Sequence, residues 1–463
     1  MVIFKKILLY FVFLENTFFY FFCKNIFTFF VKYNIIILGG EFVMKNYLPR
    51  IVDNEIEELL SFMGGVLIEG CKWCGKSTTA KEHVKSILEF QNPDRKNEFD
   101  NIKNTKPSLF LDGEKPRLFD EWQMYPVIWD CIRTDIDHSG LKGQYILTGS
   151  AKPSEGETMH TGTGRISRIL MRPMSLYESK ESNGKVSMQD IFEGKDISAT
   201  SSLTLEDIAS AIVRGGWPAS LEVKGDTKYK IASEYVKSLL HEEVNYERNI
   251  EINPSKMLAI LRSLARNIST PVSNSTIVED VKNYFENSIS RPTLNDYLNT
   301  LEKLFVIENI QATNLNFRSK SSLRAKPKKE FVDPSIATAI LELTPNDLIK
   351  DLNLFGFLFE CMCIRDLKVY TQKNNCEITF YRDENNFEVD AILRTQNGKW
   401  GAVEIKLGAG YIEDAAQNLL KFKNKVDTKK CGMPSFLMVL TGSNYSYKRD
   451  DGVYVVSIGT LKD

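Results

Sequence analysis

The chain has 463 residues, of which 43% are hydrophobic and 26% are charged. These proportions exclude fibrous and largely disordered classes, and at roughly 150 residues per domain the length predicts about three domains. Lys and Arg number 59 against 60 Asp and Glu, a net charge of -1, so any nucleic-acid contact must come from a local basic patch. Eight cysteines without a framework spacing favour a reducing compartment, and we expect the cytoplasm.

Residues 1–43 differ from the rest of the chain because they are crowded with Phe, Tyr, Ile, Asn and Lys. Two lysines before an apolar run imitate a signal peptide, but no small-residue cleavage site follows. A membrane span needs about 18 apolar residues with few charges, and Glu15, Lys24 and Lys32 interrupt this tract. We therefore expect no stable membrane association, although a costly span over Ile7–Cys23 stays open.

The same segment has a second interpretation, which concerns the gene. Its residues are those that AT-rich DNA encodes, and Gly39-Gly40-Glu41 before Met44 can be encoded by a purine run that resembles a bacterial ribosome-binding site. We therefore expect translation to start at Met44 and residues 1–43 to be an artefact of gene-start assignment.

A phosphate-binding loop follows the first predicted strand. Gly64–Glu69 is a short apolar run of the buried parallel type, and Thr79–Leu88 has helical character. The segment between them matches G-x-x-x-x-G-K-[ST] without a mismatch, in the strand–loop–helix context that the motif requires. Lys76 is predicted to reach the β- and γ-phosphates, and Ser77 to bind Mg²⁺. The residues expected to contact ATP are Gly70, Cys71, Lys72, Trp73, Cys74, Gly75, Lys76, Ser77 and Thr78.

Two further predicted strands supply acidic and hydroxyl groups. Residues 116–121 end in Asp120 and Glu121; we expect Asp120 to hold Mg²⁺ through water and Glu121 to polarise the attacking water. Residues 145–147 lead into Thr148, whose hydroxyl can contact the γ-phosphate or the lytic water. Alone, such a strand end is more often a solvated turn, but after the phosphate loop a catalytic role is favoured.

Several motifs in order resemble a family of prokaryotic AAA-type ATPases whose members carry a C-terminal domain of unknown function. The motifs are Asp120-Glu121-Trp122-Gln123, Ile146-Leu147-Thr148-Gly149-Ser150, Gly164-Arg165, Arg172-Pro173-Met174-Ser175-Leu176 and Gly215-Gly216-Trp217-Pro218. The resemblance implies an ATPase core with an additional strand and with Arg165 near the nucleotide, acting in cis or from a neighbouring subunit of a homo-oligomer. The alternative is that the arginines lie on the solvated face of a strand.

The middle of the chain has a winged-helix pattern, and the family resemblance agrees. Three helical segments, 255–266, 274–285 and 291–305, precede strand-like residues 306–313 and 330–332. Between these strands lies a run without acidic residues that can neutralise several phosphates. Its basic residues are Arg318, Lys320, Arg324, Lys326, Lys328 and Lys329. We expect DNA binding here; a solvated loop or a protein-contacting winged helix is the alternative.

The C-terminal region resembles the PD-(D/E)xK nuclease-like fold. Asp390 lies on one predicted strand, and Glu404 and Lys406 lie on its hairpin partner. The carboxylates would hold Mg²⁺, whose charge polarises a phosphodiester, and the lysine would orient the attacking water. Glu360, on the preceding helix, would complete the metal site, and Gln417 would orient the lysine. A solvated hairpin, or a nuclease-like fold without activity, is the alternative.

The register of this hairpin decides whether its carboxylates can meet. A two-residue turn would place Asp390 and Glu404 on opposite faces of the sheet. A three-residue loop, Gln396-Asn397-Gly398, pairs Thr395 with Lys399 and sets Asp390 directly opposite Glu404. We predict the three-residue loop, because its last residue adopts a left-handed conformation that glycine tolerates.

The sequence therefore predicts an α/β protein of three domains after the extension. They are an AAA-like ATPase domain with a helical lid or connector over residues 44–250, a winged helix-turn-helix over residues 251–335, and a PD-(D/E)xK-like domain over residues 336–463. The leading functional hypothesis is an ATP- and Mg²⁺-dependent enzyme that acts on DNA. The competing hypothesis is a nucleotide-switch regulator with an inactive nuclease-like domain.

Overall fold

The computed structural model describes residues 35–38, 41–44, 47–150, 163–243, 253–284, 289–313 and 326–463. The chain divides into two units, Met1–Leu48 and Pro49–Asp463. In the first, β1 (Ile35–Leu38) pairs with β2 (Glu41–Met44) in antiparallel fashion. The predicted apolar tract before residue 35 lies outside the described residues. Within the described ranges, no helix is both long and apolar enough to cross a membrane.

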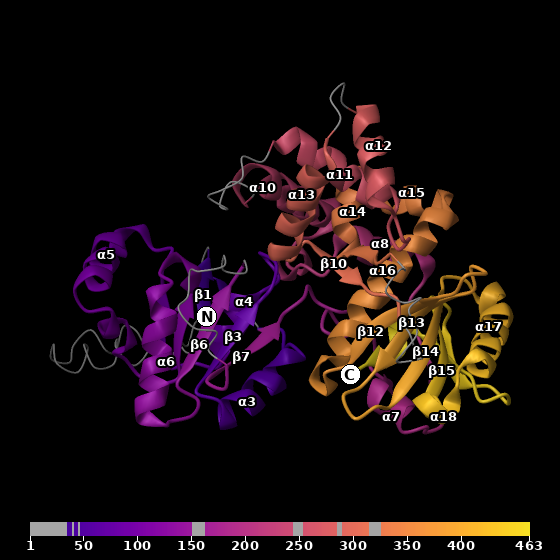
Figure 1. Ribbon diagram of the computed structural model, residues 1–463, viewed down its shortest axis with the longest axis horizontal. Helices are drawn as coiled ribbons and strands as arrows, with labels where there is room; N and C mark the ends of the chain where they lie inside the picture. The colour runs from indigo at the N-terminus through magenta and orange to yellow at the C-terminus, as the bar shows by residue number, and fades with distance from the viewer. Residues whose placement is uncertain are drawn as a thin grey trace. The chain divides into compact units, whose positions relative to one another are not determined.

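A five-stranded parallel sheet opens the second unit (Figure 1). Its strands in spatial order are β4 (Ser86–Glu89), β5 (Arg117–Asp120), β6 (Tyr145–Gly149), β3 (Gly65–Glu69) and β7 (Ile166–Leu170). Because β6 lies between β3 and β5, the sheet has the additional strand that the family resemblance implies. The predicted strands in this region are confirmed.

The two faces of this sheet bury alternate residues of β3. Val66 and Ile68 pack in one cluster with α3 (Val52–Phe62), whereas Leu67 packs in another with α6 (Val127–Ser139). The helix predicted over Thr79–Leu88 is wrong in its second half. Helix α4 (Lys76–Glu82) ends before β4, because residues 86–89 pair with β5 and tertiary pairing overrides helical propensity.

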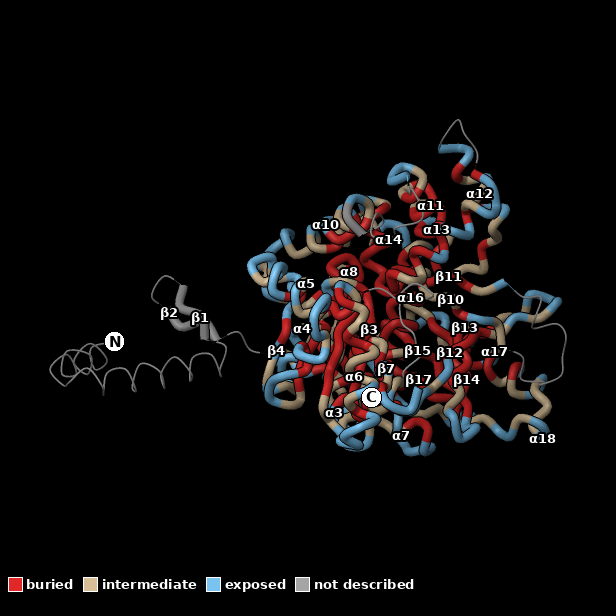
Figure 2. Tube along the Cα trace, turned by 60° about the vertical axis from the view of Figure 1, so that its left-hand side comes forward, coloured by how far each residue is buried: buried red, intermediate tan, exposed pale blue. Residues whose placement is uncertain are grey.

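The middle of the chain is helical. Its elements are α8 (Leu205–Arg214), α9 (Pro218–Leu221), α10 (Lys230–Ser238), α11 (Pro254–Arg266), α12 (Asn274–Tyr284), α13 (Arg291–Lys303), α14 (Pro334–Ile340) and α15 (Pro345–Lys350). The three predicted helices are confirmed as α11, α12 and α13. After them, β10 (Ile307–Ile310) and β11 (Lys328–Phe331) form an antiparallel pair. Figure 2 shows exposed positions along α12 and buried ones on α8.

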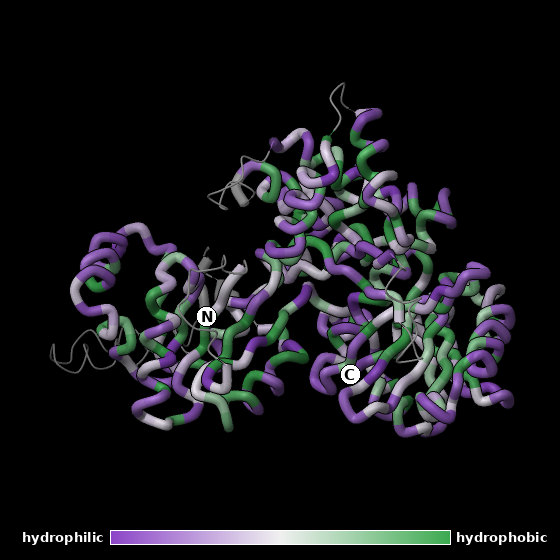
Figure 3. Tube along the Cα trace, in the orientation of Figure 1, coloured by the Kyte–Doolittle hydropathy of each residue, from purple (hydrophilic) through white to green (hydrophobic). Residues whose placement is uncertain are grey.

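A seven-stranded sheet forms the C-terminal part. Its spatial order is β12 (Glu377–Arg382), β13 (Glu388–Arg394), β14 (Trp400–Lys406), β15 (Phe436–Thr441), β17 (Tyr454–Ser457), β16 (Tyr445–Lys448) and β9 (Ser198–Thr200). Helices α16 (Leu352–Thr371), α17 (Ile412–Lys425) and α18 (Thr428–Cys431) accompany it. In Figure 3 the hydrophobic positions of this sheet gather on its central strands, whereas α17 carries many hydrophilic positions, as expected of a helix with one solvated face.

Strands from the predicted ATPase segment enter the C-terminal part. β9 completes the seven-stranded sheet by pairing with β16, and β8 (Val186–Ser187) pairs with β18 (Leu461–Lys462). The same segment also contains the helices α5 (Lys96–Thr105) and α7 (Met188–Phe192). No local pattern around residues 186–200 indicates partners more than 200 residues away.

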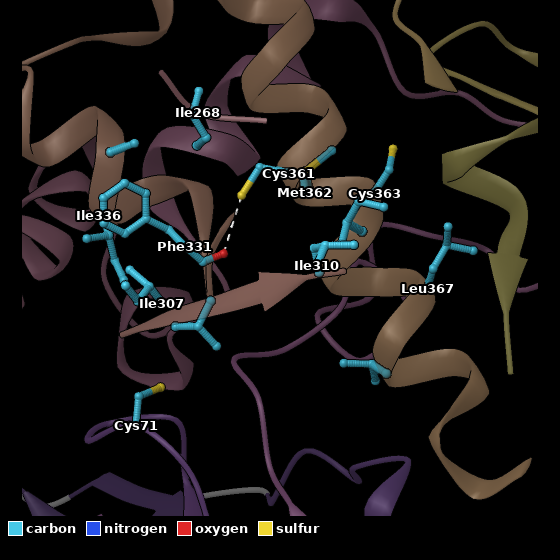
Figure 4. Close-up of a cluster of buried hydrophobic side chains, with 14 of the residues drawn as sticks. Cys71, Ile268, Ile307, Ile310, Phe331, Ile336, Cys361, Met362, Cys363 and Leu367 are labelled. Carbon is cyan, nitrogen blue, oxygen red and sulfur yellow. Dashed lines mark hydrogen bonds between the residues drawn. The ribbon is translucent and has the colours of Figure 1, made fainter. Parts of the chain in front are cut away.

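One apolar cluster joins the middle region to α16 (Figure 4). It contains Ile307, Ile310, Phe331 and Cys361, and the Cys361 thiol donates to the Phe331 carbonyl oxygen over 3.4 Å. The same cluster includes Cys71 of the phosphate loop. The strands β10 and β11 are therefore fixed against α16 by packing, which matters for the charged residues that they carry.

Candidate functional sites

The loop between β3 and α4 has the backbone that its motif requires. Gly70 has φ 151°, and a Cβ atom there would lie 2.1 Å from the Met171 carbonyl oxygen; Gly75 has φ 103°. Both values favour glycine. Lys76 Nζ donates to the carbonyl oxygens of Gly70 at 2.9 Å and Cys71 at 2.8 Å. The ammonium group is thereby held at the phosphate loop.

The side chains of this loop point in different directions. Cys71 and Cys74 are fully buried, whereas the Trp73 side chain is 45% exposed and its ring centroid lies 5.8 Å from that of Tyr235 in α10. A hydrogen bond with Cys71 lowers the pKa of the Cys74 thiol to about 6 against the effect of burial. Because both thiols face the core, these two cysteines can contribute only backbone groups to a bound nucleotide.

The predicted acidic and hydroxyl residues come together beside α4. The Asp120 carboxylate accepts hydrogen bonds from Ser77 Oγ at 2.6 Å and Thr148 Oγ1 at 2.5 Å. Glu121 has φ 56°, and its carboxylate accepts from Gln123 Nε2 at 2.5 Å and Ser150 Oγ at 3.0 Å. The carboxylate is therefore fixed in position.

Arg50 was not predicted from the sequence, and its side chain holds the backbone of the phosphate loop in place. Its guanidinium donates to the Cys74 carbonyl oxygen at 2.8 Å, to Glu178 at 2.9 Å and to the Arg172 carbonyl oxygen at 2.8 Å. A lone arginine before α3 belongs to no recognisable sequence motif, so only the fold identifies its role.

Arg165 does not lie where the cis role requires it. It precedes β7, and its carbonyl oxygen accepts from Gly64 and Gly65 at the start of β3, whereas the phosphate loop follows the other end of that strand. Five strand residues separate these edges by about 16 Å. The Arg165 guanidinium instead pairs with Asp137 at 2.7 Å. The expectation of a contact with the nucleotide of the same chain is therefore wrong.

The predicted hairpin register is confirmed. Ala391 pairs with Val403 and Arg394 with Trp400, and the Thr395 N–H donates to the Lys399 carbonyl oxygen at 2.9 Å. The loop therefore has three residues, and Gly398 at its end has φ 85°. The same register sets Asp390 opposite Glu404.

Lys406 bridges the two carboxylates on this face. Its Nζ atom lies 3.0 Å from Asp390 and 2.7 Å from Glu404, and the Ile405 N–H also donates to Asp390 at 2.7 Å. Burial and the Asp390 charge raise the pKa of Glu404 to about 8. Burial alone would also raise the pKa of Asp390, but Lys406 and Lys328 lower it below its ordinary value.

Lys328 enters the same site, contrary to the prediction that it contacts DNA. Its Nζ atom lies 2.8 Å from Glu360 and 2.7 Å from Glu388, and its side chain is 3% exposed. Lys329 is also buried, whereas Lys326 is exposed. Lys328 and Lys329 cannot contact a phosphate backbone because both are buried on β11. Arg318, Lys320 and Arg324 lie outside the described residues.

The α17 side chain that bonds to the C-terminal carboxylates is Asn418. The prediction that Gln417 orients Lys406 is wrong. Asn418 Nδ2 donates to Glu404 at 2.6 Å and to the Glu388 carbonyl oxygen at 2.9 Å. Gln417 is exposed and bonds to Glu413 on its own helix. A one-residue step turns a helix by about 100°, and the buried positions of α17 would have indicated Asn418.

These groups line a cavity of about 630 Å³ between the middle region and the C-terminal sheet. Its charged lining includes Lys328, Glu360, Asp390, Glu404 and Lys406. Across the described part of the chain, no group of three or more His, Cys, Asp or Glu side chains is arranged to hold a metal ion. The carboxylates converge here, but they do so around two ammonium groups.

Three family models match separate segments. Residues 64–180 match a model described as an AAA domain, residues 205–347 match a domain of unknown function (DUF8612), and residues 355–461 match another domain of unknown function (DUF4143). A comparison with curated proteins returns no match. The AAA match covers the phosphate loop, the acidic strand and the additional strand between them. Residues 64–180 form an AAA-type P-loop ATPase domain.

Three solved structures that the chain resembles share 16% identity or less with it. A Walker-type ATPase of Pyrococcus abyssi has 16% identity and a TM-score of 0.40, over 62% of this chain and 94% of that chain. A signal-transduction ATPase with a tetratricopeptide repeat sensor from Pyrococcus horikoshii has 14% identity and a TM-score of 0.23, over 69% and 48%. Thermococcus gammatolerans McrB AAA+ hexamers with bound McrC give 10% identity and a TM-score of 0.21, over 63% and 74%.

The ATPase domain is tied to the rest of the chain by a partly buried ion cluster. Arg172, which follows β7, pairs with Glu308 of β10 at 2.9 Å, and Lys368 of α16 pairs with the same carboxylate. Although burial raises it, the pKa of Glu308 is held well below its ordinary value by Arg172 and Lys368. Since Arg50 binds both the Arg172 carbonyl oxygen and the phosphate loop, one short series of contacts joins the ATP site to α16.

Proposed function

We propose that this ATPase acts on DNA, with residues 251–335 as a winged helix-turn-helix and residues 336–463 as a PD-(D/E)xK-like domain. The observation that carries the proposal is the three-residue hairpin loop, which sets Asp390, Glu404 and Lys406 on one face of β13 and β14. Such a face beside a cavity matches the residue pattern of phosphodiester-cleaving sites.

For the ATP site we assign Lys76 to the β- and γ-phosphates, Glu121 to the attacking water and Thr148 to the γ-phosphate or that water. Ser77 and Asp120 supply the hard oxygen ligands that Mg²⁺ prefers, and their oxygens lie 2.6 Å apart. Bound there, Mg²⁺ would neutralise charge on the phosphates. Arg165 can act only from a neighbouring subunit, so this role requires a homo-oligomer.

The middle region supports DNA contact through its elements. Helices α11, α12 and α13 precede the pair β10 and β11, which is the order of a winged helix. The exposed Lys326 stands where the basic run meets β11. With Lys328 and Lys329 buried, fewer charges can neutralise phosphates than the sequence indicates, so we expect a shallower dependence of affinity on salt.

A second function is favoured by Lys328. The C-terminal residues as arranged do not fit a metal ion, because Lys406 and Lys328 already engage their carboxylates. A nucleotide-switch regulator, in which ATP occupancy controls DNA or partner binding and the C-terminal domain is inactive, accounts for this arrangement without cleavage.

One experiment separates these functions. We would measure ATP turnover of the full chain with and without DNA, and strand nicking with Mg²⁺. The enzyme hypothesis predicts DNA-stimulated turnover and nicking that Lys406→Ala abolishes. Lys399→Ala, an exposed lysine of the same hairpin, is the matched control and should nick normally. ATP-dependent DNA binding without nicking supports the regulator. The proposal is contradicted if DNA does not change ATP turnover and the chain does not bind DNA.

A further inference from the structure

Lys328 belongs to one part of the chain and its partners belong to another. It lies on β11, opposite Ile310 of β10, whereas Glu360 lies on α16 and Glu388 begins β13. The ammonium group bridges these two carboxylates at 2.8 and 2.7 Å, and its side chain is 3% exposed. A strand of the middle region therefore provides a cation to the C-terminal site.

The C-terminal site divides its charges between two ammonium groups. Lys406 bridges Asp390 and Glu404, and Lys328 bridges the other two carboxylates of the cluster. Buried carboxylates at such distances need compensating positive charge, because an unpaired buried charge is strongly unfavourable. A divalent cation needs the same oxygen ligands, so an ammonium group and a metal ion compete for them.

The position of Lys328 is fixed by packing and by strand pairing. The Phe331 carbonyl oxygen of β11 accepts a hydrogen bond from the Cys361 thiol of α16 at 3.4 Å (Figure 4). Two backbone hydrogen bonds join the residues after β10 to Phe380. The Thr313 N–H donates to the Phe380 carbonyl oxygen at 2.6 Å, and the Phe380 N–H donates to the Gln311 carbonyl oxygen at 3.0 Å. The chain after β10 thus bonds to β12, the edge strand of the C-terminal sheet, and Lys328 Nζ lies 5.2 Å from the centre of the Phe380 ring.

We propose that Lys328 is the built-in counter-cation of the C-terminal carboxylates and that it excludes a divalent metal ion from them. A metal ion then binds when the lysine is replaced. This inference rests on the proposed nuclease-like site, but it concerns metal binding alone and holds whether or not the domain cuts DNA.

The test measures Mn²⁺ binding to the nucleotide-free full chain by electron paramagnetic resonance. Wild type should bind Mn²⁺ weakly, whereas Lys328→Met should bind one ion at least tenfold more tightly. Lys329→Met, which removes the neighbouring buried lysine, should behave as wild type. Adding Glu404→Gln to Lys328→Met should weaken the new site. Equal Mn²⁺ affinity in wild type and Lys328→Met, or no binding by the folded variant, would overturn the inference.

A second variant covers the case in which Lys328→Met does not fold. Lys328→Met with Glu360→Gln removes one positive and one negative charge together and leaves Glu388, Asp390 and Glu404 in place. Mn²⁺ should raise the Tm of this double variant by several degrees and leave that of wild type unchanged. An unchanged Tm in both proteins would contradict the inference. Neither measurement contains DNA or ATP, so failure of the DNA assay and failure of this test are distinguishable.

Discussion

The ATP site and the C-terminal site contain the same residue types, lysine and carboxylate, but they pair them differently. At the ATP site, Lys76 donates to two backbone carbonyl oxygens, and the Asp120 carboxylate accepts from two hydroxyl groups. At the C-terminal site, both lysines bind carboxylates directly. In the first site the opposite charges are held apart, and in the second they neutralise each other.

This difference bears on what each site can bind. Charged side chains that bond only to neutral groups are not neutralised, so their electric field can act on a ligand. A polyphosphate can therefore bind the lysine while its metal ion binds the carboxylate. Charges that already form ion pairs must first be separated, at a cost that grows with burial. The ATP site is thus ready for its ligand, whereas the C-terminal site requires a rearrangement.

The largest expected effect tests the readiness of the ATP site. Glu121→Gln should keep ATP affinity and lower the rate of hydrolysis by about 10²–10⁴-fold, because only the water-polarising carboxylate is lost. Binding is measured by calorimetry and turnover by phosphate release. Glu114→Gln, an exposed position before β5, is the control. Hydrolysis at the wild-type rate in Glu121→Gln would show that another group activates the water.

A smaller effect is expected at the junction that connects the two sites. Arg172→Met should lower the free energy of unfolding by roughly 2 kcal/mol, less than the ~3–5 kcal/mol for a buried charge left alone, because Lys368 still pairs with Glu308. Urea denaturation measures the change. Arg95→Met, which breaks an exposed pair with Glu98, should lower the free energy of unfolding much less than Arg172→Met does, because exposed ion pairs contribute little to stability.

The pH dependence of this effect follows from the lowered pKa of Glu308. Stabilisation from a carboxyl with a depressed folded pKa is present above its unfolded pKa of about 4.3 and is lost as pH falls through the folded value. The difference between wild type and Arg172→Met should therefore be constant at neutral pH and shrink below about pH 4. A difference that persists undiminished in acid would assign the defect to packing.

The sequence predicted what depends on local pattern and missed what depends on distant partners. The phosphate loop, the acidic strand and the hairpin register follow from spacing and turn chemistry, and the structure has them where the sequence placed them. The prediction that Lys328 contacts DNA is wrong because a basic run in a sequence suggests an exposed segment, whereas β11 is buried at every position. The expected contact of Arg165 with the nucleotide of its own chain is wrong, because a position beside a glycine does not reveal which edge of the sheet the residue occupies.

The smallest expected effect tests how the C-terminal carboxylates are positioned. Asn418→Ala removes the amide that donates to Glu404 at 2.6 Å. The free energy of unfolding should fall by only about 1 kcal/mol, the lower end of the cost of an unsatisfied buried acceptor, because Lys406 still pairs with Glu404. The pKa of Glu404, already raised by burial, should rise further because the amide lowers it. Gln417→Ala, one residue earlier and exposed, should change stability by less than about 0.5 kcal/mol. Carboxyl titration by NMR and urea denaturation of both variants measure the two effects. If Gln417→Ala proved the more damaging change, α17 would present a different face to the site. The partners assigned to the C-terminal carboxylates, which distinguish this site from the ATP site, would then be wrong.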